Sequence, residues 1–172
     1  MSTSAHSAHV VSFRLNGHPM DVEAEGGESL LSVLRDQIGM RGTKNACTQG
    51  ECGSCTVHID GTPVCSCLVP VGQCADASIT TIEGLAATDT GARLQQAFIT
   101  AGAVQCGFCT PGLVMQAAAL QHRPVEDDEM SPAPLAFTDN EIREHLSGNL
   151  CRCTGYDKIV NAVRAAVNGE PS

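Results

Sequence analysis

The sequence predicts an α+β protein, with a mixed β-sheet and one helix in the first half and only helices in the second half. Short runs of β-forming residues separated by turn signals continue to about residue 84, and Ala-, Gln- and Leu-rich text with helical spacing follows them. Ten Cys among 172 residues, with only 3% aromatic residues, indicate that a metal contributes to stability or function. We therefore expect two domains, residues 1–84 and residues 85–172.

The chain opens with signals for a hairpin followed by a helix. Residues 9–16 are rich in β-formers, an Asn-Gly turn follows, and residues 20–23 can return as the second arm. Between residues 29 and 38 the apolar side chains share one helical face, and Gly39 is placed to end that helix. This part of the sequence predicts two strands and one helix.

A loop and a second hairpin complete the first half. Residues 42–55 are rich in Gly and Cys and follow neither the helical nor the strand period, so we expect a loop there. Residues 56–59 and 63–69, on either side of an Asp-Gly turn, predict a second hairpin, and residues 77–82 predict a further short strand.

Four helices are expected in the second half, at residues 92–100, 111–122, 139–146 and 156–168. The start and stop signals are Pro111 in a first turn, Thr138 with Glu141 as a capping box, Thr154 with Asp157 as a similar pair, and Gly169 at the end. Residues 123–137 carry four acidic residues and three prolines, which predicts an exposed loop.

Charge and hydropathy exclude several classes of partner. The formal net charge of -9 argues against nucleic acid or an anionic membrane as the main partner. No apolar run approaches the roughly 20 residues of a membrane helix, and the opening residues lack the apolar stretch of a secretory signal. We therefore expect a cytoplasmic protein, in which a high density of thiols indicates metal binding rather than disulfides.

The first group of thiols is Cys47, Cys52 and Cys55, spaced C-x4-C-x2-C. Three ligands on one short loop, with a fourth from the neighbouring hairpin, suit a plant-type 2Fe-2S cluster. Because Cys65 and Cys67 share one face of the predicted strand, the alternation of side chains leaves open which of them is the fourth ligand. A structural zinc site is the alternative, although zinc sites usually pair two short knuckles.

Glycines in this loop have an expected role. Gly42, Gly50 and Gly53 lack a Cβ, so the backbone can bend through unusual dihedrals and bring N–H groups close to the cluster sulfurs. Such hydrogen bonds spread the negative charge of the thiolates and help to set the reduction potential.

The second group of thiols combines a C-x2-C pair, Cys106 and Cys109, with a C-x-C pair, Cys151 and Cys153, after 41 intervening residues. In an extended segment residues two apart point the same way, so Cys151 and Cys153 can face one metal centre while Arg152 faces away. The C-x2-C pair precedes a predicted helix, whose N-terminal amides favour thiolates. On ligand identity alone, zinc remains an alternative here.

Taken together, these motifs resemble the small two-cluster subunit of the xanthine oxidase family of molybdenum hydroxylases. The matching segments are CTQGECGSCTV, the SCL around Cys67, QCGFCTPG and LSGNLCRCTGY, in this order, and they span nearly the whole chain. The resemblance implies a β-grasp ferredoxin-like domain followed by a four-helix bundle. It favours iron-sulfur clusters over the alternative of zinc sites in both groups of thiols. It also implies that the fourth ligand of the first cluster is Cys67, directly before Leu68. The implied cluster ligands are Cys47, Cys52, Cys55, Cys67, Cys106, Cys109, Cys151 and Cys153.

The same resemblance implies an electron relay without substrate chemistry on this chain. In the family, a large molybdopterin-bearing subunit hydroxylates its substrate with oxygen from water, and single electrons pass through two 2Fe-2S clusters towards a medium subunit with FAD. Gln105, Cys106 and Cys153 match positions that lie against the pterin, so Gln105 is expected to hydrogen-bond it, with an ordinary surface amide as the alternative. Two other functions stay open: a freestanding two-cluster ferredoxin that shuttles electrons between soluble partners, and a zinc-stabilised interaction module.

Three further residues receive structural expectations. Cys65 and Cys74 are additional to the eight implied ligands, and free thiols often behave as small buried apolar side chains. A regulatory thiol is the alternative for both. Tyr156, the sole Tyr, is expected to pack at the head of the last helix, a role that requires no contact with an electron path.

Overall fold

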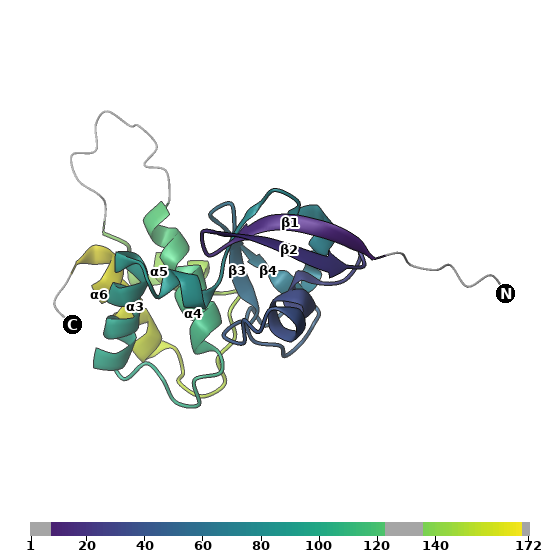
Figure 1. Ribbon diagram of the computed structural model, residues 1–172. Coiled ribbons are helices and arrows are strands. Elements are labelled where there is room, and N and C mark those ends of the chain that lie inside the picture. The colour runs from purple at the N-terminus through teal and green to yellow at the C-terminus, as the bar shows by residue number, and fades with distance from the viewer. Residues whose placement is uncertain (1–7, 123–135, 170–172) are drawn as a thin grey trace.

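The computed structural model describes residues 8–122 and 136–169 of the chain. A five-stranded sheet with one short helix lies on one side of the molecule, and the longer helices gather on the other side (Figure 1). No helix within these two described ranges is long and apolar enough to cross a membrane. The predicted combination of a mixed sheet with a helical second half is confirmed.

The sheet has the strand order β2-β1-β5-β3-β4, in which β1 and β5 are parallel and the other pairs are antiparallel. Its strands are β1 (His9–Leu15), β2 (His18–Ala24), β3 (Thr56–Ile59), β4 (Thr62–Cys65) and β5 (Ser78–Thr80). Both predicted hairpin turns form, because Asn16-Gly17 and Asp60-Gly61 take positive φ angles at both residues, as tight hairpins require.

The helix predicted at residues 29–38 begins as α1 (Leu30–Ser32) and continues as a π-helix over Val33–Gln37. The Ser29 hydroxyl caps its start by accepting a hydrogen bond from the Ser32 N–H. Gly39 follows with a φ of +87°, a conformation that glycine adopts without strain and that ends the helix as predicted.

The strand predicted at residues 63–69 is wrong beyond Cys65. The chain leaves the sheet there and turns through a 3₁₀ segment, Ser66–Leu68, followed by another at Val71–Cys74. Buried Ser66 causes the turn, since its backbone N–H and its hydroxyl both donate to the Cys55 carbonyl, at 3.3 and 2.8 Å. Cys65 and Cys67 therefore do not share a strand face.

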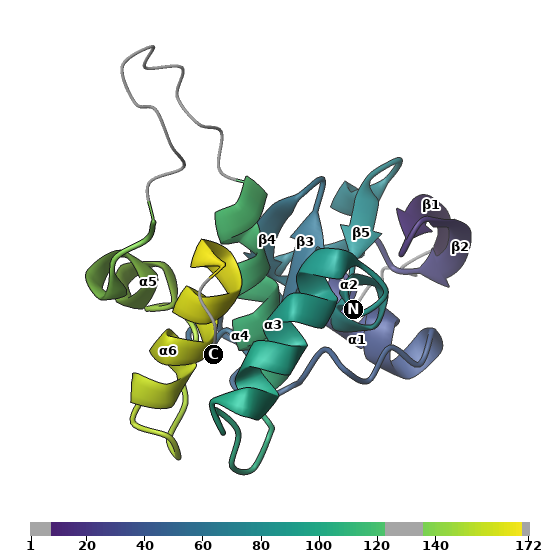
Figure 2. The same ribbon diagram turned by 90° about the vertical axis from the view of Figure 1, so that its left-hand side faces the viewer.

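The second half contains α2 (Ile82–Leu85), α3 (Asp89–Thr100), α4 (Thr110–Ala118), a 3₁₀ turn at Ala119–His122, α5 (Asp139–His145) and α6 (Asp157–Asn168), which Figure 2 shows side by side. Pro111 lies in the first turn of α4, and the capping box of Thr138 with Glu141 is present. The similar pair predicted at Thr154 is wrong: its hydroxyl accepts from the N–H of Tyr156, which occupies the N-cap of α6 in a left-handed conformation.

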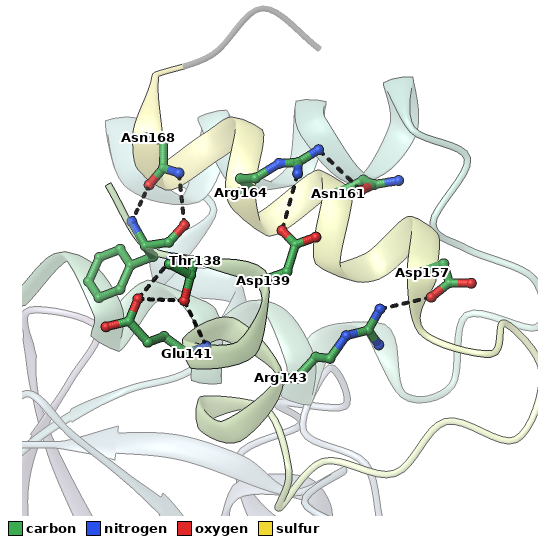
Figure 3. A network of polar contacts seen from close by, with 9 residues as sticks. Thr138, Asp139, Glu141, Arg143, Asp157, Asn161, Arg164 and Asn168 are labelled. Carbon is green, nitrogen blue, oxygen red and sulfur yellow. Dashed lines mark hydrogen bonds and ion pairs between the residues drawn. The ribbon is translucent and has the colours of Figure 1, made fainter. Parts of the chain in front are cut away.

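Polar contacts tie α5 to α6 (Figure 3). Arg143 pairs with Asp157 at 2.9 Å, and Arg164 pairs with Asp139 at 3.1 Å. Such partly exposed ion pairs contribute little to stability, so the buried apolar faces of the helices hold them together. Most of the loop predicted at residues 123–137 lies outside the described residues.

Two hydrophobic cores form, one beneath the sheet and one among the helices, and α4 packs against β3 where they meet. The Nε2 of buried His58, on β3, lies 2.8 Å from the Met115 carbonyl of α4. Near the start of α4, a Cβ on Gly112 would lie 2.4 Å from the Gly53 carbonyl oxygen. The helical core can approach the first thiol loop this closely only because residue 112 is glycine.

Gly112→Ala is therefore expected to destabilise the protein by about 1–3 kcal/mol, a typical cost of forcing a methyl group into a packed site. Alanine favours a helix over glycine by about 1 kcal/mol, but here the neighbour is backbone and must move. Denaturant unfolding checks this, with Gly148→Ala as the control because a Cβ there would meet nothing within 4 Å. Equal midpoints for the two variants would contradict the packing argument.

Candidate metal centres

The first candidate centre gathers five thiols. Cys47, Cys52 and Cys55 lie on the loop before β3, Cys65 ends β4, and Cys67 lies in the 3₁₀ turn that follows. The Cys47 and Cys52 thiols are hydrogen-bonded to each other, and the Cys55 thiol contacts both Cys65 and Cys67. The structure thus brings the four expected thiols together and adds Cys65 to them.

The glycines of this loop act in two different ways. Gly50 and Gly53 take φ angles of +76° and +67°, as their expected role requires. Gly42 does not take a positive φ, so the prediction for it is wrong. A Cβ on Gly42 would lie 2.3 Å from Ile82 Cγ2, and its N–H donates to Glu83 Oε1 at 2.8 Å, so Gly42 serves packing against α2.

Hydrogen bonding distinguishes the thiols of the first centre. The backbone N–H groups of Gln49 and Cys52 donate to the Cys47 sulfur and lower the pKa of that thiol to about 6. Burial raises the pKa of Cys67 to about 12, an effect that the Gly50 N–H partly offsets by donating to the sulfur. Burial, together with the neighbouring Cys55, raises the pKa of Cys65 to about 11, and the Cys65 thiol donates to the Gly50 carbonyl at 3.9 Å.

The second candidate centre joins thiols from two connections of the helical half, between α3 and α4 and between α5 and α6. Cys106 and Cys109 precede α4, and Cys109 is its N-cap, whereas Cys151 and Cys153 lie between α5 and α6. Cys153 Sγ lies 3.7 Å from Cys106 Sγ, and the Cys151 and Cys109 thiols are hydrogen-bonded. The four expected thiols therefore meet in two hydrogen-bonded pairs, Cys106 with Cys153 and Cys109 with Cys151.

The backbone around the C-x-C pair is bent rather than extended, so the extended segment predicted there is wrong. Thr154 causes the bend: its hydroxyl contacts Cys151 Sγ at 3.2 Å and accepts from the Tyr156 N–H. Both thiols of the pair nevertheless reach the C-x2-C thiols, and Arg152 is exposed.

The electrostatics of the second centre differ from the expectation. Burial and the neighbouring Cys151 raise the pKa of Cys109 to about 12, so the predicted thiolate-favouring effect of the helix N-terminus does not prevail there. At Cys151, burial opposes ionisation, but hydrogen bonds from the Thr154 hydroxyl and neighbouring amides together lower the pKa. The Cys106 thiol, by hydrogen bonding, raises the pKa of Cys153.

The donor set of both centres fits iron-sulfur chemistry. Soft thiolate ligands on glycine-rich loops, with backbone N–H groups directed at sulfur, are the arrangement that holds and tunes such clusters. Within the described ranges no three His, Cys, Asp or Glu side chains converge on one point as a single metal ion requires. The thiols of the second centre are instead arranged in two pairs.

Two residues near the second centre were not found by sequence reasoning. Asn149 is 3% exposed, and its Nδ2 donates to the Gly53 carbonyl at 2.9 Å. Tyr156 lies at the head of α6 as expected, but its hydroxyl also accepts from the Cys151 N–H at 2.7 Å and donates to the Asn149 carbonyl at 3.0 Å. The only sequence signal for Asn149 was a polar residue close to the C-x-C pair.

The three residues expected to lie against the pterin, Gln105, Cys106 and Cys153, are all exposed.

Two family models match the chain. The 2Fe-2S iron-sulfur cluster binding domain matches residues 13–82, and the [2Fe-2S] binding domain matches residues 81–164. The two matches follow each other and together cover most of the sequence.

Named relatives match almost from end to end. The chain is 45% identical to the nicotinate dehydrogenase small FeS subunit of Eubacterium barkeri, over 91% of this chain and 94% of that protein. It is 46% identical to the xanthine dehydrogenase iron-sulfur-binding subunit of Escherichia coli O157:H7, over 87% of this chain and 88% of that protein.

Solved structures agree in fold. Quinoline 2-oxidoreductase from Pseudomonas putida 86 contains a chain that is 40% identical, with a TM-score of 0.81 and coverage of 96% of this chain and 99% of that one. The aldehyde oxidoreductase of Desulfovibrio desulfuricans matches with a TM-score of 0.82 and 35% identity, over 95% of this chain but only 18% of that one. The chain therefore has two 2Fe-2S binding domains and belongs to the iron-sulfur small subunits of the xanthine oxidase family of molybdenum hydroxylases.

Proposed function

We propose that this chain is the electron-transfer subunit of a molybdenum hydroxylase, carrying single electrons from a large molybdopterin-bearing subunit towards a medium FAD-bearing subunit. The observation that carries the proposal is the presence of two separate four-thiol sites in one chain, joined where α4 and the segment before Cys151 contact the loop of the first site. When bound, the 2Fe-2S clusters accept and release one electron each. The chain's own residues bind the two clusters and hold them apart.

The first cluster is held by Cys47, Cys52, Cys55 and Cys67, and the second by Cys106, Cys109, Cys151 and Cys153. Support for Cys67 over Cys65 comes from Gly50. Its amide donates to the Cys67 sulfur, as the amides around a cluster thiolate do, whereas the Cys65 thiol is itself a donor to the Gly50 carbonyl. Cys65 and Cys74 then remain protonated thiols.

The purified protein is expected to contain about four iron and four acid-labile sulfide per chain, from two four-Cys sites. Iron and sulfide assays after anaerobic purification measure this directly. A protein that carries zinc without sulfide would instead be a zinc-stabilised module, and the central proposal would fail.

The molybdopterin-bearing subunit is proposed to cover the exposed edge of the second site. Gln105, Cys106 and Cys153 are exposed there, and Val104 and Phe108, on the same loop, add exposed apolar surface that an assembly can bury. We propose that Gln105 hydrogen-bonds the pterin in that assembly. Purification from the native host tests this, because a large molybdenum-containing subunit should co-purify in equal amount. Isolation of the chain alone, with both clusters, would identify a freestanding ferredoxin.

The finer architecture is proposed on the same grounds. The sheet half corresponds to a β-grasp ferredoxin-like domain, residues 1–84, and the helical half to a four-helix bundle, residues 85–172. Support comes from the two separate hydrophobic cores, which meet where α4 packs against β3. Ten free thiols suit the reducing cytoplasm, where we place the protein.

A further inference from the structure

One short segment, residues 148–150, contacts the first thiol loop from the side of the second centre. The Leu150 N–H donates to the Cys52 carbonyl at 2.9 Å. The Asn149 side chain donates through Nδ2 to the Gly53 carbonyl at 2.9 Å and to Thr56 Oγ1 at 3.2 Å. The segment that precedes Cys151 is thus hydrogen-bonded to residues on both sides of Cys55 in the sequence.

The contact depends on burial and on close approach. Asn149 is 3% exposed and Thr56 is 5% exposed, so water does not compete for these hydrogen bonds. On the opposite side, a Cβ on Gly53 would lie 2.4 Å from the Gly148 carbonyl and 2.5 Å from Asn149 Nδ2. Only glycine at residue 53 admits the carboxamide at this distance.

Asn149 also belongs to the hydrogen bonding of the second centre. Its backbone carbonyl accepts from the Tyr156 hydroxyl at 3.0 Å, and that hydroxyl accepts from the Cys151 N–H at 2.7 Å. The side chain of Asn149 therefore contacts Gly53, which lies between Cys52 and Cys55 of the first centre. Its backbone carbonyl is connected to Cys151 of the second centre through the Tyr156 hydroxyl. An apolar side chain of the same size would leave the buried Gly53 carbonyl and Thr56 hydroxyl without this donor.

We propose that Asn149 is a positioning residue that fixes the separation and relative orientation of the two clusters. The proposal rests on the function proposed above, because it concerns the relation between two bound clusters. Among the described residues, the hydrogen bonds of the Asn149 side chain go to Gly53 and Thr56 and not to a thiol, so its effect passes through Gly53 and, from its backbone carbonyl, through Tyr156. Magnetic interaction and electron transfer between two centres both weaken steeply with distance, so a small displacement of one loop changes both.

The test replaces Asn149 in the cluster-loaded protein as it purifies. Asn149→Ala is expected to retain about four iron and four sulfide and both paramagnetic signals. The magnetic interaction between the two reduced clusters, read in electron paramagnetic resonance as signal splitting or enhanced relaxation, is expected to be lost or clearly reduced. Asn161→Ala is the matched control, because that amide is exposed on α6 and contacts only Arg164 among the contacts in Figure 3.

A second variant keeps the proposal testable if Asn149→Ala does not assemble. Thr56→Val retains the shape of the side chain but removes the hydroxyl that accepts from Asn149 Nδ2, and a smaller change of the interaction in the same direction is expected. The proposal is overturned if both variants lose stability but keep the magnetic interaction unaltered, because Asn149 is then merely structural. Where Asn149→Ala does not assemble, the same result for Thr56→Val alone overturns it. A failure of the proposed function would differ, because the unsubstituted protein would then lack iron and sulfide.

Discussion

Cys67→Ser is expected to remove the first cluster, whereas Cys65→Ser is expected to leave both clusters in place. The two thiols are separated by one residue, and both contact the Cys55 thiol. The difference between them is the group that each sulfur meets at Gly50. The amide N–H stabilises a thiolate at Cys67, and the carbonyl accepts the proton of the Cys65 thiol. Burial raises the pKa of both free thiols, to about 12 at Cys67 and about 11 at Cys65, so the distinction rests on the direction of the hydrogen bond at Gly50 and not on ionisation of the free thiols. Because a cluster thiolate accepts such amide hydrogen bonds, Cys67 is expected to be the ligand.

Iron analysis and electron paramagnetic resonance together measure this result. Cys67→Ser is expected to reduce iron from about four to about two per chain and to leave one paramagnetic signal, and Cys65→Ser to retain about four and both signals. Cys74→Ala serves as a control for loss of a thiol as such, because Cys74 is buried in the core beneath the sheet. The opposite behaviour of the two Ser variants would show that Cys65 is the ligand.

Most of the secondary structure could be predicted because its signals are local. The hairpin turns, the capping box at Thr138 and the stop at Gly169 each depend on residues a few positions apart. The wrong predictions have a different origin. The strand after Cys65 fails because Ser66 bonds to the Cys55 carbonyl, eleven positions away, and no periodicity encodes that contact.

The candidate centres, like the secondary structure, could be predicted where their signals are local in sequence. Cysteine spacing indicated which thiols gather, because short ligand spacings on one loop are a local pattern. That both Cys65 and Cys67 contact Cys55 was not predictable, since this requires the register of β3 against β4 and the turn that follows β4. The role of Asn149 was not predicted because its contact is also long-range in sequence. Its partner Gly53 lies 96 positions away, and a single buried polar contact leaves no pattern in the sequence.

Two substitutions in the assembled hydroxylase are expected to block electron flow at different points. Cys109→Ser should remove the second cluster, so that the substrate reduces neither the first cluster nor the flavin. Cys47→Ser should let the substrate reduce the second cluster but not the flavin. Cys109 is chosen because it is less exposed than Cys106 and Cys153, so its loss acts through the cluster and not through a surface that faces the partner.

The physical basis of this order is the placement of the two centres. The second centre has two exposed thiols at the surface proposed to face the molybdopterin, and the first centre is reached from it across the contact at Asn149. Electrons that enter at the exposed edge must therefore pass the second centre before the first. Anaerobic stopped-flow absorbance follows the flavin, and freeze-quenched paramagnetic resonance follows the remaining cluster, with Cys65→Ser as the control that keeps both sites. If the flavin is still reduced at the normal rate in the Cys47→Ser assembly, the two centres do not act in series.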